Sequence, residues 1–337
     1  MQNLIIMNLF DLPKVELHLH LEGAAQPEFI KMFSKGKGLK SSHLFNSQGN
    51  YKFNSFSEFL SIYESVTSLF KTPEDFKVLT ESVLEECVAN NIIYVESFIS
   101  PEWCGGNDVS AWKEYVQAME EASDAAKKKN GIIFKAIVTC IRHLGPEKAS
   151  RAALCAAETV GNWVVGFGMA GDEKIGRQKD YLYSFHLARE AKLHLTTHAG
   201  EWCGAESVRD AIEHLEVERI GHGVQAVGDD DLLSLIKEKQ VVLEVCPGSN
   251  IALGIYKNLE NHPIKTLRDA AVKVTISTDD PPFFNTSLSK EYTELESTFG
   301  WDLHDFKDLN ITAASAAFCD EATKNKLINT LNNSYTL

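Results

Sequence analysis

The chain has 337 residues and a formal net charge of −14, which argues against nucleic acid as a partner because so acidic a surface repels phosphate backbones. Its seven cysteines are an odd number without a CxxC pair, which argues against both a disulfide framework and a cysteine-rich zinc site. With no run of about 18 apolar residues and no signal-peptide features at its start, the chain is expected to be cytoplasmic, without a membrane partner.

Eight short apolar runs, rich in β-branched residues, are the candidate strands. They span residues 15–20, 92–99, 132–140, 164–170, 193–199, 219–223, 241–246 and 272–279. Most are nearly continuous rather than alternating, which is typical of strands that are buried on both faces of a parallel sheet.

Helix-length segments separate these runs. Residues 73–91 begin with Pro73 and acidic residues, and residues 108–131 end with lysines, Asn130 and Gly131, which are ordinary helix start and stop signals. Eight βα repeats predict a (β/α)8 TIM barrel, a fold that commonly takes about 250 residues or more. A doubly wound open sheet is the weaker alternative, because no Gly-rich phosphate loop follows any strand.

One connection, residues 24–91 between the first two strands, is unusually long. Within it, residues 53–70 place Phe56, Phe59 and Leu60 at helical spacing. We expect this helical insertion to cap the active-site mouth and to form an apolar wall of a substrate pocket; plain packing against the barrel is the alternative. No internal repeat or linker interrupts the chain, so residues 1–337 are predicted to form one domain.

Polar residues gather where the predicted strands end. In VELHLHLEG, the residues His18, His20 and Glu22 alternate along one strand, so their side chains share a face. The carboxyl ends of barrel strands form the active-site mouth, so polar side chains from several strands are expected to meet there. The other strand ends contribute Asp172, Glu173, His198, Glu201, His222, Asp279 and Asp280.

A metal site follows from this arrangement. Two buried imidazoles side by side are costly unless something shares them. His198 and Asp279 complete a set of three nitrogens and one oxygen with His18 and His20. These donors suit one divalent ion per chain, with Zn²⁺ the leading candidate. The ion would lower the pKa of a bound water to about 7 and so favour hydrolytic attack on an electrophilic carbon.

The remaining polar residues at the mouth are interpreted separately. Glu201, His222 and Asp280 could orient the water or exchange protons with it. Asp172 and Glu173 are as consistent with a solvated loop as with a site. Cys203 and Cys246 are expected to pack rather than bind metal. Seven histidines are given no role: His43, His143, His186, His194, His214, His262 and His304.

At this point the motifs resemble a known family. PKVELHLHLEG, AGDE, HAGE, RIGHG and STDDP are similar, in order and spacing, to the motifs of the adenosine deaminase family, metal-dependent hydrolases on a (β/α)8 barrel. The resemblance covers about residues 12–320. It implies that His18, His20, His198 and Asp279 hold zinc. It also implies that a small purine is the partner and that adenosine or 2′-deoxyadenosine is hydrolysed to its inosine product and ammonia.

The resemblance also implies roles for the other residues. Glu201 is similar to the residue that protonates purine N1, and His222 to the group that orients and deprotonates the zinc-bound water. Asp280 is similar to the residue that contacts the hydroxide and N7, and Gly171 to the glycine whose backbone N–H meets N3. The implied substrate contacts are His20, Glu22, Gly171 and Asp280, with Phe56, Phe59 and Leu60 as an apolar gate.

Glu22 departs from the family pattern. Adenosine-specific members usually have an aspartate here, which binds the ribose 5′-hydroxyl, whereas related adenine and aminodeoxyfutalosine deaminases often have glutamate. The adenine branch, however, typically has Ser-Glu where this chain has Gly171 and Asp172, and Asp-His-Gly at residues 221–223. Adenosine is therefore the predicted substrate, with adenine, N6-substituted adenine or aminodeoxyfutalosine as the alternative. AMP is not expected, because no basic cluster accompanies the motifs.

Two rival classes are weaker. A two-metal hydrolase needs a bridging group, usually a lysine, at the end of the fourth strand, where this chain reads GFGMAGDE. A purine-binding protein without activity would leave Glu201, His222 and Asp280 idle. The oligomeric state is left open.

Overall fold

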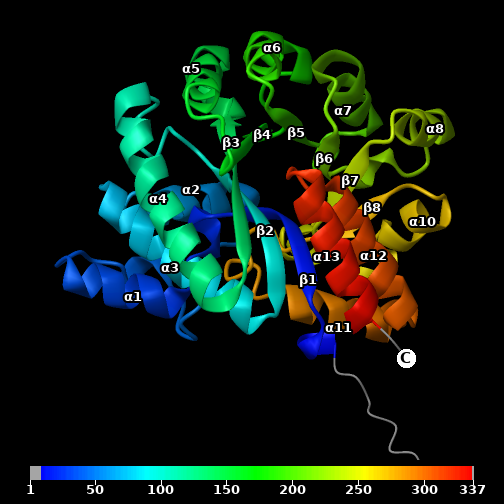
Figure 1. Cartoon of the computed structure of the whole chain (residues 1–337), viewed down its shortest axis with the longest axis horizontal. Helices are drawn as coiled ribbons and strands as arrows, with labels where there is room; N and C mark the ends of the chain where they lie inside the picture. The colour runs from blue at the N-terminus through cyan, green and yellow to red at the C-terminus, as the bar shows by residue number, and fades with distance from the viewer. Residues whose placement is uncertain (1–8, 336–337) are drawn as a thin grey trace, which may run out of the picture.

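The computed structural model describes residues 9–335 and has at its centre a sheet of eight parallel strands paired in chain order. The sheet closes because the backbone N of Asp279 donates to the carbonyl of His18 (2.9 Å), and the backbone N of His20 donates to the carbonyl of Asp279 (3.0 Å). The predicted (β/α)8 barrel is therefore confirmed (Figure 1). The strands are β1 (Lys14–His20), β2 (Ile92–Ile99), β3 (Ile133–Ile141), β4 (Val164–Ala170), β5 (His194–Ala199), β6 (Arg219–His222), β7 (Val242–Val245) and β8 (Val274–Ile276).

Helices surround the sheet, and the predicted signals explain where two of them begin or end (Figure 1). Thr72 and Asp75 form a capping box at the start of α3. Helix α4 begins after Asp108, which caps it, and ends at Gly131, whose φ of 79° lies in the left-handed region. The α-helices are α1 (Pro27–Gly36), α2 (Phe56–Thr67), α3 (Pro73–Ala89), α4 (Val109–Asn130), α5 (Pro146–Ala157), α6 (Leu182–Glu190), α7 (Ala205–Asp210), α8 (Asp230–Glu238), α9 (Pro247–Ala252), α10 (Ile264–Asp269), α11 (Leu288–Phe299), α12 (Leu303–Ala316) and α13 (Glu321–Ser334).

Two elements differ from the sequence prediction. Strand β8 is shorter than the predicted residues 272–279, since the chain turns at Asp279, whose φ is 66°. One of the helix-length segments between the predicted strands begins as α7 and continues as a π-helix over Ala211–Leu215. Residues 1–8, where no signal peptide is predicted, lie outside the described residues. None of the described helices combines the length and the apolar character needed to cross a membrane.

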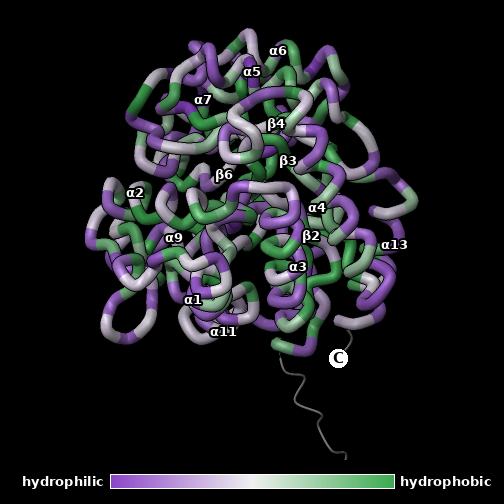
Figure 2. The backbone as a smooth tube through the Cα atoms, turned by 90° about the vertical axis from the view of Figure 1, so that its left-hand side faces the viewer, coloured by the Kyte–Doolittle hydropathy of each residue, from purple (hydrophilic) through white to green (hydrophobic). Residues whose placement is uncertain are grey.

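Strand β1 shows how the barrel wall divides apolar from polar side chains. Val15, Leu17 and Leu19 are buried in the apolar core, whereas His18 and His20, on the opposite face of the strand, point toward the barrel axis. In Figure 2, hydrophobic residues (green) are concentrated around the central strands β3 and β4, and hydrophilic residues (purple) are frequent on the outer helices.

The barrel axis contains a buried ion-pair network. Arg219 of β6 donates to Glu96 of β2 and to Glu244 of β7, each at 2.5 Å. Glu244 also accepts from Nδ1 of His18 at 2.8 Å. All four side chains are buried. Because a charge left unpaired here would be costly, the network fixes the position of His18 relative to three other strands.

The long connection between β1 and β2 contains α1, α2 and α3. Five residues of α2 line a cavity at the end of the barrel where β1 ends, namely Phe56, Phe59, Leu60, Tyr63 and Glu64, of which all but Glu64 are apolar or aromatic. The insertion thus places an apolar helix face at the mouth of the barrel.

Candidate metal centre and active site

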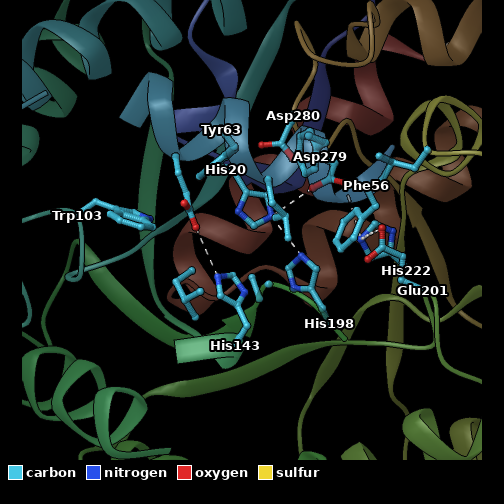
Figure 3. A pocket seen from close by; sticks show the side chains of 17 residues that line it. His20, Phe56, Tyr63, Trp103, His143, His198, Glu201, His222, Asp279 and Asp280 are labelled. Atoms are coloured by element: carbon cyan, nitrogen blue, oxygen red, sulfur yellow. Dashed lines mark hydrogen bonds and ion pairs between the residues drawn. The ribbon is translucent and has the colours of Figure 1, made fainter. Parts of the chain in front are cut away.

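Four side chains converge at the carboxyl ends of three strands. His18 and His20 come from β1, His198 from β5, and Asp279 follows β8. One ligand atom from each residue lies within 4.8 Å of the others. Nε2 of His20 is 3.2 Å from Nε2 of His198 and 3.2 Å from Oδ1 of Asp279 (Figure 3). The structure therefore brings together all four residues that the sequence predicts as metal ligands.

The donor atoms of this cluster are oriented so that they can bind a cation. Nδ1 of His18 donates to Glu244, and Nδ1 of His198 donates to the carbonyl of Met169 at 2.9 Å, so the Nε2 atom of each ring faces the cluster. Nε2 of His18 is buried and has no hydrogen-bond partner among the described residues. Burial and the nearby imidazoles hold the pKa of His198 well below its usual value, which keeps the ring in the neutral form that binds metals. These residues fit a divalent ion such as zinc.

A second set of potential ligands shares two members with the first. His18, His222, Cys246 and Asp279 also place one donor atom each within 4.8 Å of one another. Burial raises the pKa of the Cys246 thiol well above its usual value, and this thiol contacts the carbonyl of Glu244 at 3.6 Å. Since Nε2 of His18 can bind one ion, the two sets are alternative positions for a single metal. They differ in whether sulfur is a ligand.

The backbone is strained at two of the site residues. His222 has a φ of 64° and Asp279 a φ of 66°, in the left-handed region that side chains other than glycine rarely adopt. Gly221, which precedes His222, has no room for a side chain, because a Cβ there would lie 2.6 Å from Cε1 of His18. The close approach of β1 and β6 therefore requires a glycine at this position.

Three further polar residues surround the metal cluster. His222, Glu201 and Asp280 are buried, and Nε2 of His222 lies 3.8 Å from Oε1 of Glu201. Burial, with Asp279 and Glu173 nearby, raises the pKa of Glu201 well above its usual value. Among residues 9–335, Nε2 of His222 and Oδ1 of Asp280 have no hydrogen-bond partner. The structure thus groups a carboxyl whose protonated form is favoured by burial with two polar atoms that are available to a ligand.

These residues open onto a cavity of about 590 Å³ at the mouth. Gly171, Phe56, Phe59 and Leu60 line it, as the sequence predicts. A Cβ at Gly171, where φ is 100°, would lie 2.7 Å from Nδ1 of His143. The other lining residues are His20, Tyr63, Glu64, Trp103, Ile141, His143, Ala170, His198, Glu201, His222, Leu253, Asp279 and Asp280.

Glu22 is placed differently from the sequence expectation. It lies behind Tyr63 rather than on the cavity wall, and it is buried. The hydroxyl of Tyr63 donates to Oε2 of Glu22 at 3.2 Å, whereas Oε1 has no partner. Burial raises the pKa of Glu22 to about 7.

Sequence reasoning missed several residues of the site. His143 was given no role, yet it lines the cavity opposite Glu201 and His222 and lies 3.8 Å from Glu64 (Figure 3). Trp103 lines the same cavity, and its indole N–H has no hydrogen-bond partner among the described residues. His143 follows the predicted third strand, so its place at a strand end was the signal that could have found it.

Glu173 has a structural role in the site. Its buried carboxylate accepts four consecutive backbone N–H groups of residues 200–203, at 2.6–3.0 Å, and the hydroxyl of Ser207 at 2.6 Å. The interpretation as a solvated loop is therefore wrong for Glu173. The carboxylate holds the turn that carries Glu201 in place.

Replacing Glu173 with Gln is expected to lower the free energy of unfolding by about 2–4 kcal/mol, because an amide NH₂ would face N–H donors that now bind a carboxylate. Urea denaturation measures this change. Glu158→Gln is the matched control, since Glu158 is half exposed and accepts from Lys113. A Glu173→Gln protein as stable as the control would contradict the anchoring role.

A sequence model of a protein family, described as adenosine deaminase, matches residues 13–334, nearly the whole chain. The chain belongs to the adenosine deaminase family. The resemblance inferred from the motifs is thereby confirmed.

Individual proteins that resemble the chain are named as purine deaminases. An adenine deaminase of Rhizobium rhizogenes is 45% identical over 318 residues, which cover 94% of this chain and 98% of the relative. The crystal structure of an adenine deaminase from Arthrobacter aurescens has a TM-score of 0.88 at 24% identity and covers 96% of this chain and 98% of that one. The apo N6-methyl-AMP deaminase of Arabidopsis thaliana has a TM-score of 0.83 at 23% identity, with 97% and 98% covered. Adenosine, the first choice from the sequence, is not the substrate that these names favour.

Proposed function

We propose that this protein is a zinc-dependent adenine deaminase, which converts adenine and water to hypoxanthine and ammonia. The observation that carries the choice of free base is the contact between Tyr63 and Glu22. Adenosine-specific members use an aspartate at residue 22 to bind ribose, but here the glutamate is bonded to Tyr63 and covered by it. The name of the Rhizobium rhizogenes relative supports the same choice.

The glycines that favoured adenosine in the sequence have packing reasons. A side chain at Gly171 would collide with His143, and one at Gly221 would collide with His18. Both glycines are therefore explained by close contacts in this chain, whatever the substrate. These two glycines therefore do not argue against adenine as the substrate.

The cavity residues can carry the chemistry of deamination. His18, His20, His198 and Asp279 would hold the zinc ion, which would lower the pKa of a water bound to it and so supply the nucleophile. We assign to Glu201 the protonation of N1, because burial raises the pKa of this carboxyl well above its usual value and so favours the protonated form.

His222 and Asp280 have polar atoms free to bind the attacking water. Glu201 gives its proton to N1 as the water oxygen bonds to C6, and the water gives one proton to a carboxylate of the cavity. The second proton of the water passes to the amino group, the C6–N bond breaks, and ammonia leaves with a carbonyl oxygen remaining at C6.

A nucleotide substrate is less well supported. The Arabidopsis thaliana relative is named for N6-methyl-AMP, but the residues that line this cavity include neither lysine nor arginine. A phosphate at the mouth would therefore meet no cation from the wall. We also propose a cytoplasmic location, because all seven cysteines are unpaired.

A substrate panel tests the proposed function. The zinc-loaded enzyme is incubated with adenine, adenosine, 2′-deoxyadenosine, N6-methyladenine, aminodeoxyfutalosine and AMP, and ammonia release is measured. The largest kcat/KM is expected for adenine. A larger kcat/KM for any nucleoside would overturn the choice of substrate, and no release from any of the six would overturn the deaminase assignment.

Replacing Glu22 with Asp is expected to raise the ratio of kcat/KM for adenosine to kcat/KM for adenine by at least about tenfold, because the shorter side chain leaves Tyr63 and frees space beside it. Glu28→Asp is the control, since Glu28 lies on the exposed side of α1. An unchanged ratio would show that residue 22 does not discriminate between base and nucleoside.

A further inference from the structure

A chain of hydrogen bonds behind His222 determines which of its ring nitrogens carries a proton. The first hydrogen bond of this series involves Ile264, whose backbone N lies 3.2 Å from Nδ1 of His262. A backbone N–H can only donate, so Nδ1 of His262 must accept and carries no proton. His262 is buried, and burial lowers its pKa to about 3. Its ring is therefore neutral, with its proton on Nε2.

The next link is the side chain of Asn250, which is fully buried. Nε2 of His262 lies 3.1 Å from one end of the Asn250 amide and, being protonated, must donate to it. That end is therefore the carbonyl oxygen. The opposite end, the NH₂ group, lies 3.1 Å from Nδ1 of His222 and must donate there. The orientation of the amide thus follows from the backbone N–H of Ile264.

The last hydrogen bond, from Asn250, determines the protonation state of His222. Because Nδ1 accepts from Asn250, it holds no proton, and a neutral ring must carry its proton on Nε2. A doubly protonated ring would place an N–H against the NH₂ of Asn250, so the arrangement also disfavours the imidazolium form. Nε2 lies 3.8 Å from Glu201 and 3.9 Å from Asp279, beyond hydrogen-bond distance, and is buried without a partner in the part of the chain that the structure describes. It is a donor that lacks an acceptor.

We propose that Asn250 and His262 are positioning residues that hold His222 with its proton on Nε2, so that His222 donates to the oxygen of the attacking water and does not take the water's proton. The part that concerns the water rests on the proposed function. It revises the role that the family resemblance implies for His222, orientation together with deprotonation, to orientation alone. The proton of the water then passes to a carboxylate of the cavity.

Nitrogen-15 NMR of the zinc-loaded enzyme, labelled at histidine, reads the state of His222 directly. His222 is identified by the signal missing from His222→Gln. We expect Nε2 to resonate as a protonated nitrogen and Nδ1 as an unprotonated one. The reverse pattern in the unmodified enzyme would overturn the proposal, and this reading requires no variant of the relay to fold.

Asn250→Asp changes the hydrogen bonds of the relay, the series that runs from Ile264 through His262 and Asn250 to His222, while keeping the shape of the side chain. A carboxylate accepts from both neighbours, so Nδ1 of His222 is expected to gain a proton. We expect kcat for adenine to fall roughly 10²–10⁴-fold, as for other enzymes with a histidine in the wrong tautomer, with KM and zinc content little changed. Asn258→Asp is the control, because Asn258 is exposed and only caps a short helix, a role that Asp also fills.

The outcomes separate the relay from the proposed function. If Asn250→Asp leaves the NMR pattern of His222 unchanged, the relay is wrong. If the pattern changes but kcat does not, the donor role is wrong. If the unmodified enzyme has its proton on Nε2 but does not deaminate adenine, the relay stands and the proposed function fails.

Discussion

Replacing His18 with Ala is expected to abolish metal binding and deamination together. Loss of an outer-shell partner typically lowers metal affinity 10- to 100-fold, so loss of a direct ligand should lower it by more than about 100-fold. His18 also joins the cluster to the ion-pair network of the barrel axis, through Glu244. Elemental analysis of the purified protein measures the zinc, and ammonia release measures the activity.

The control for this change is His304→Ala. His304 is a largely exposed histidine on α12, so the substitution removes an imidazole without touching the site. Circular dichroism should show both proteins folded. Full zinc occupancy in His18→Ala would remove His18 from the ligand set and would contradict both clusters as described, because His18 belongs to each of them.

Replacing Glu201 with Gln is expected to leave zinc bound and to lower kcat for adenine roughly 10²- to 10⁴-fold. The amide is close in size to the acid but cannot give a proton to N1. Burial, with Asp279 and Glu173 nearby, raises the pKa of Glu201 well above its usual value and so favours the protonated form that gives the proton. Steady-state kinetics together with elemental analysis distinguish this loss from loss of the metal.

Glu206→Gln is the matched control for Glu201. Glu206 lies on α7, is largely exposed, and pairs with Arg177 away from the cavity. Its replacement should leave kcat within about twofold of the unmodified value, as expected for a surface change. Equal kcat values for the unmodified enzyme and Glu201→Gln would show that another group protonates the ring.

The fold could be predicted from the sequence because the strands are largely buried on both faces, and most of them appear as nearly continuous apolar runs. The errors fall where local backbone geometry takes over. Strand β8 ends early because Asp279 has a positive φ, and the helix after β5 relaxes into a π-helix, neither of which has a pattern in the apolar residues.

The site was predictable where residues act through their position at a strand end. His18, His20, His198 and Asp279 all have this signal, and the structure brings them together. Asn250 and His262 were missed because their roles depend on contacts between segments that are far apart in the chain, which a single sequence does not reveal.

The substrate was the least predictable feature. The comparison of Gly171 and Gly221 with family motifs treated each glycine as a sign of substrate, whereas both are required by collisions with nearby histidines. The proposed choice of adenine rests on Glu22, whose contact with Tyr63 of α2 is not apparent in the sequence.

X-ray absorption spectroscopy at the zinc edge of the zinc-loaded protein tests the central claim most directly. With His18, His20, His198 and Asp279 as ligands, the first shell should contain nitrogen and oxygen alone, at about 2.0–2.2 Å, with the outer-shell pattern of several imidazoles. A sulfur atom at about 2.3 Å would place Cys246 in the coordination sphere and contradict the account.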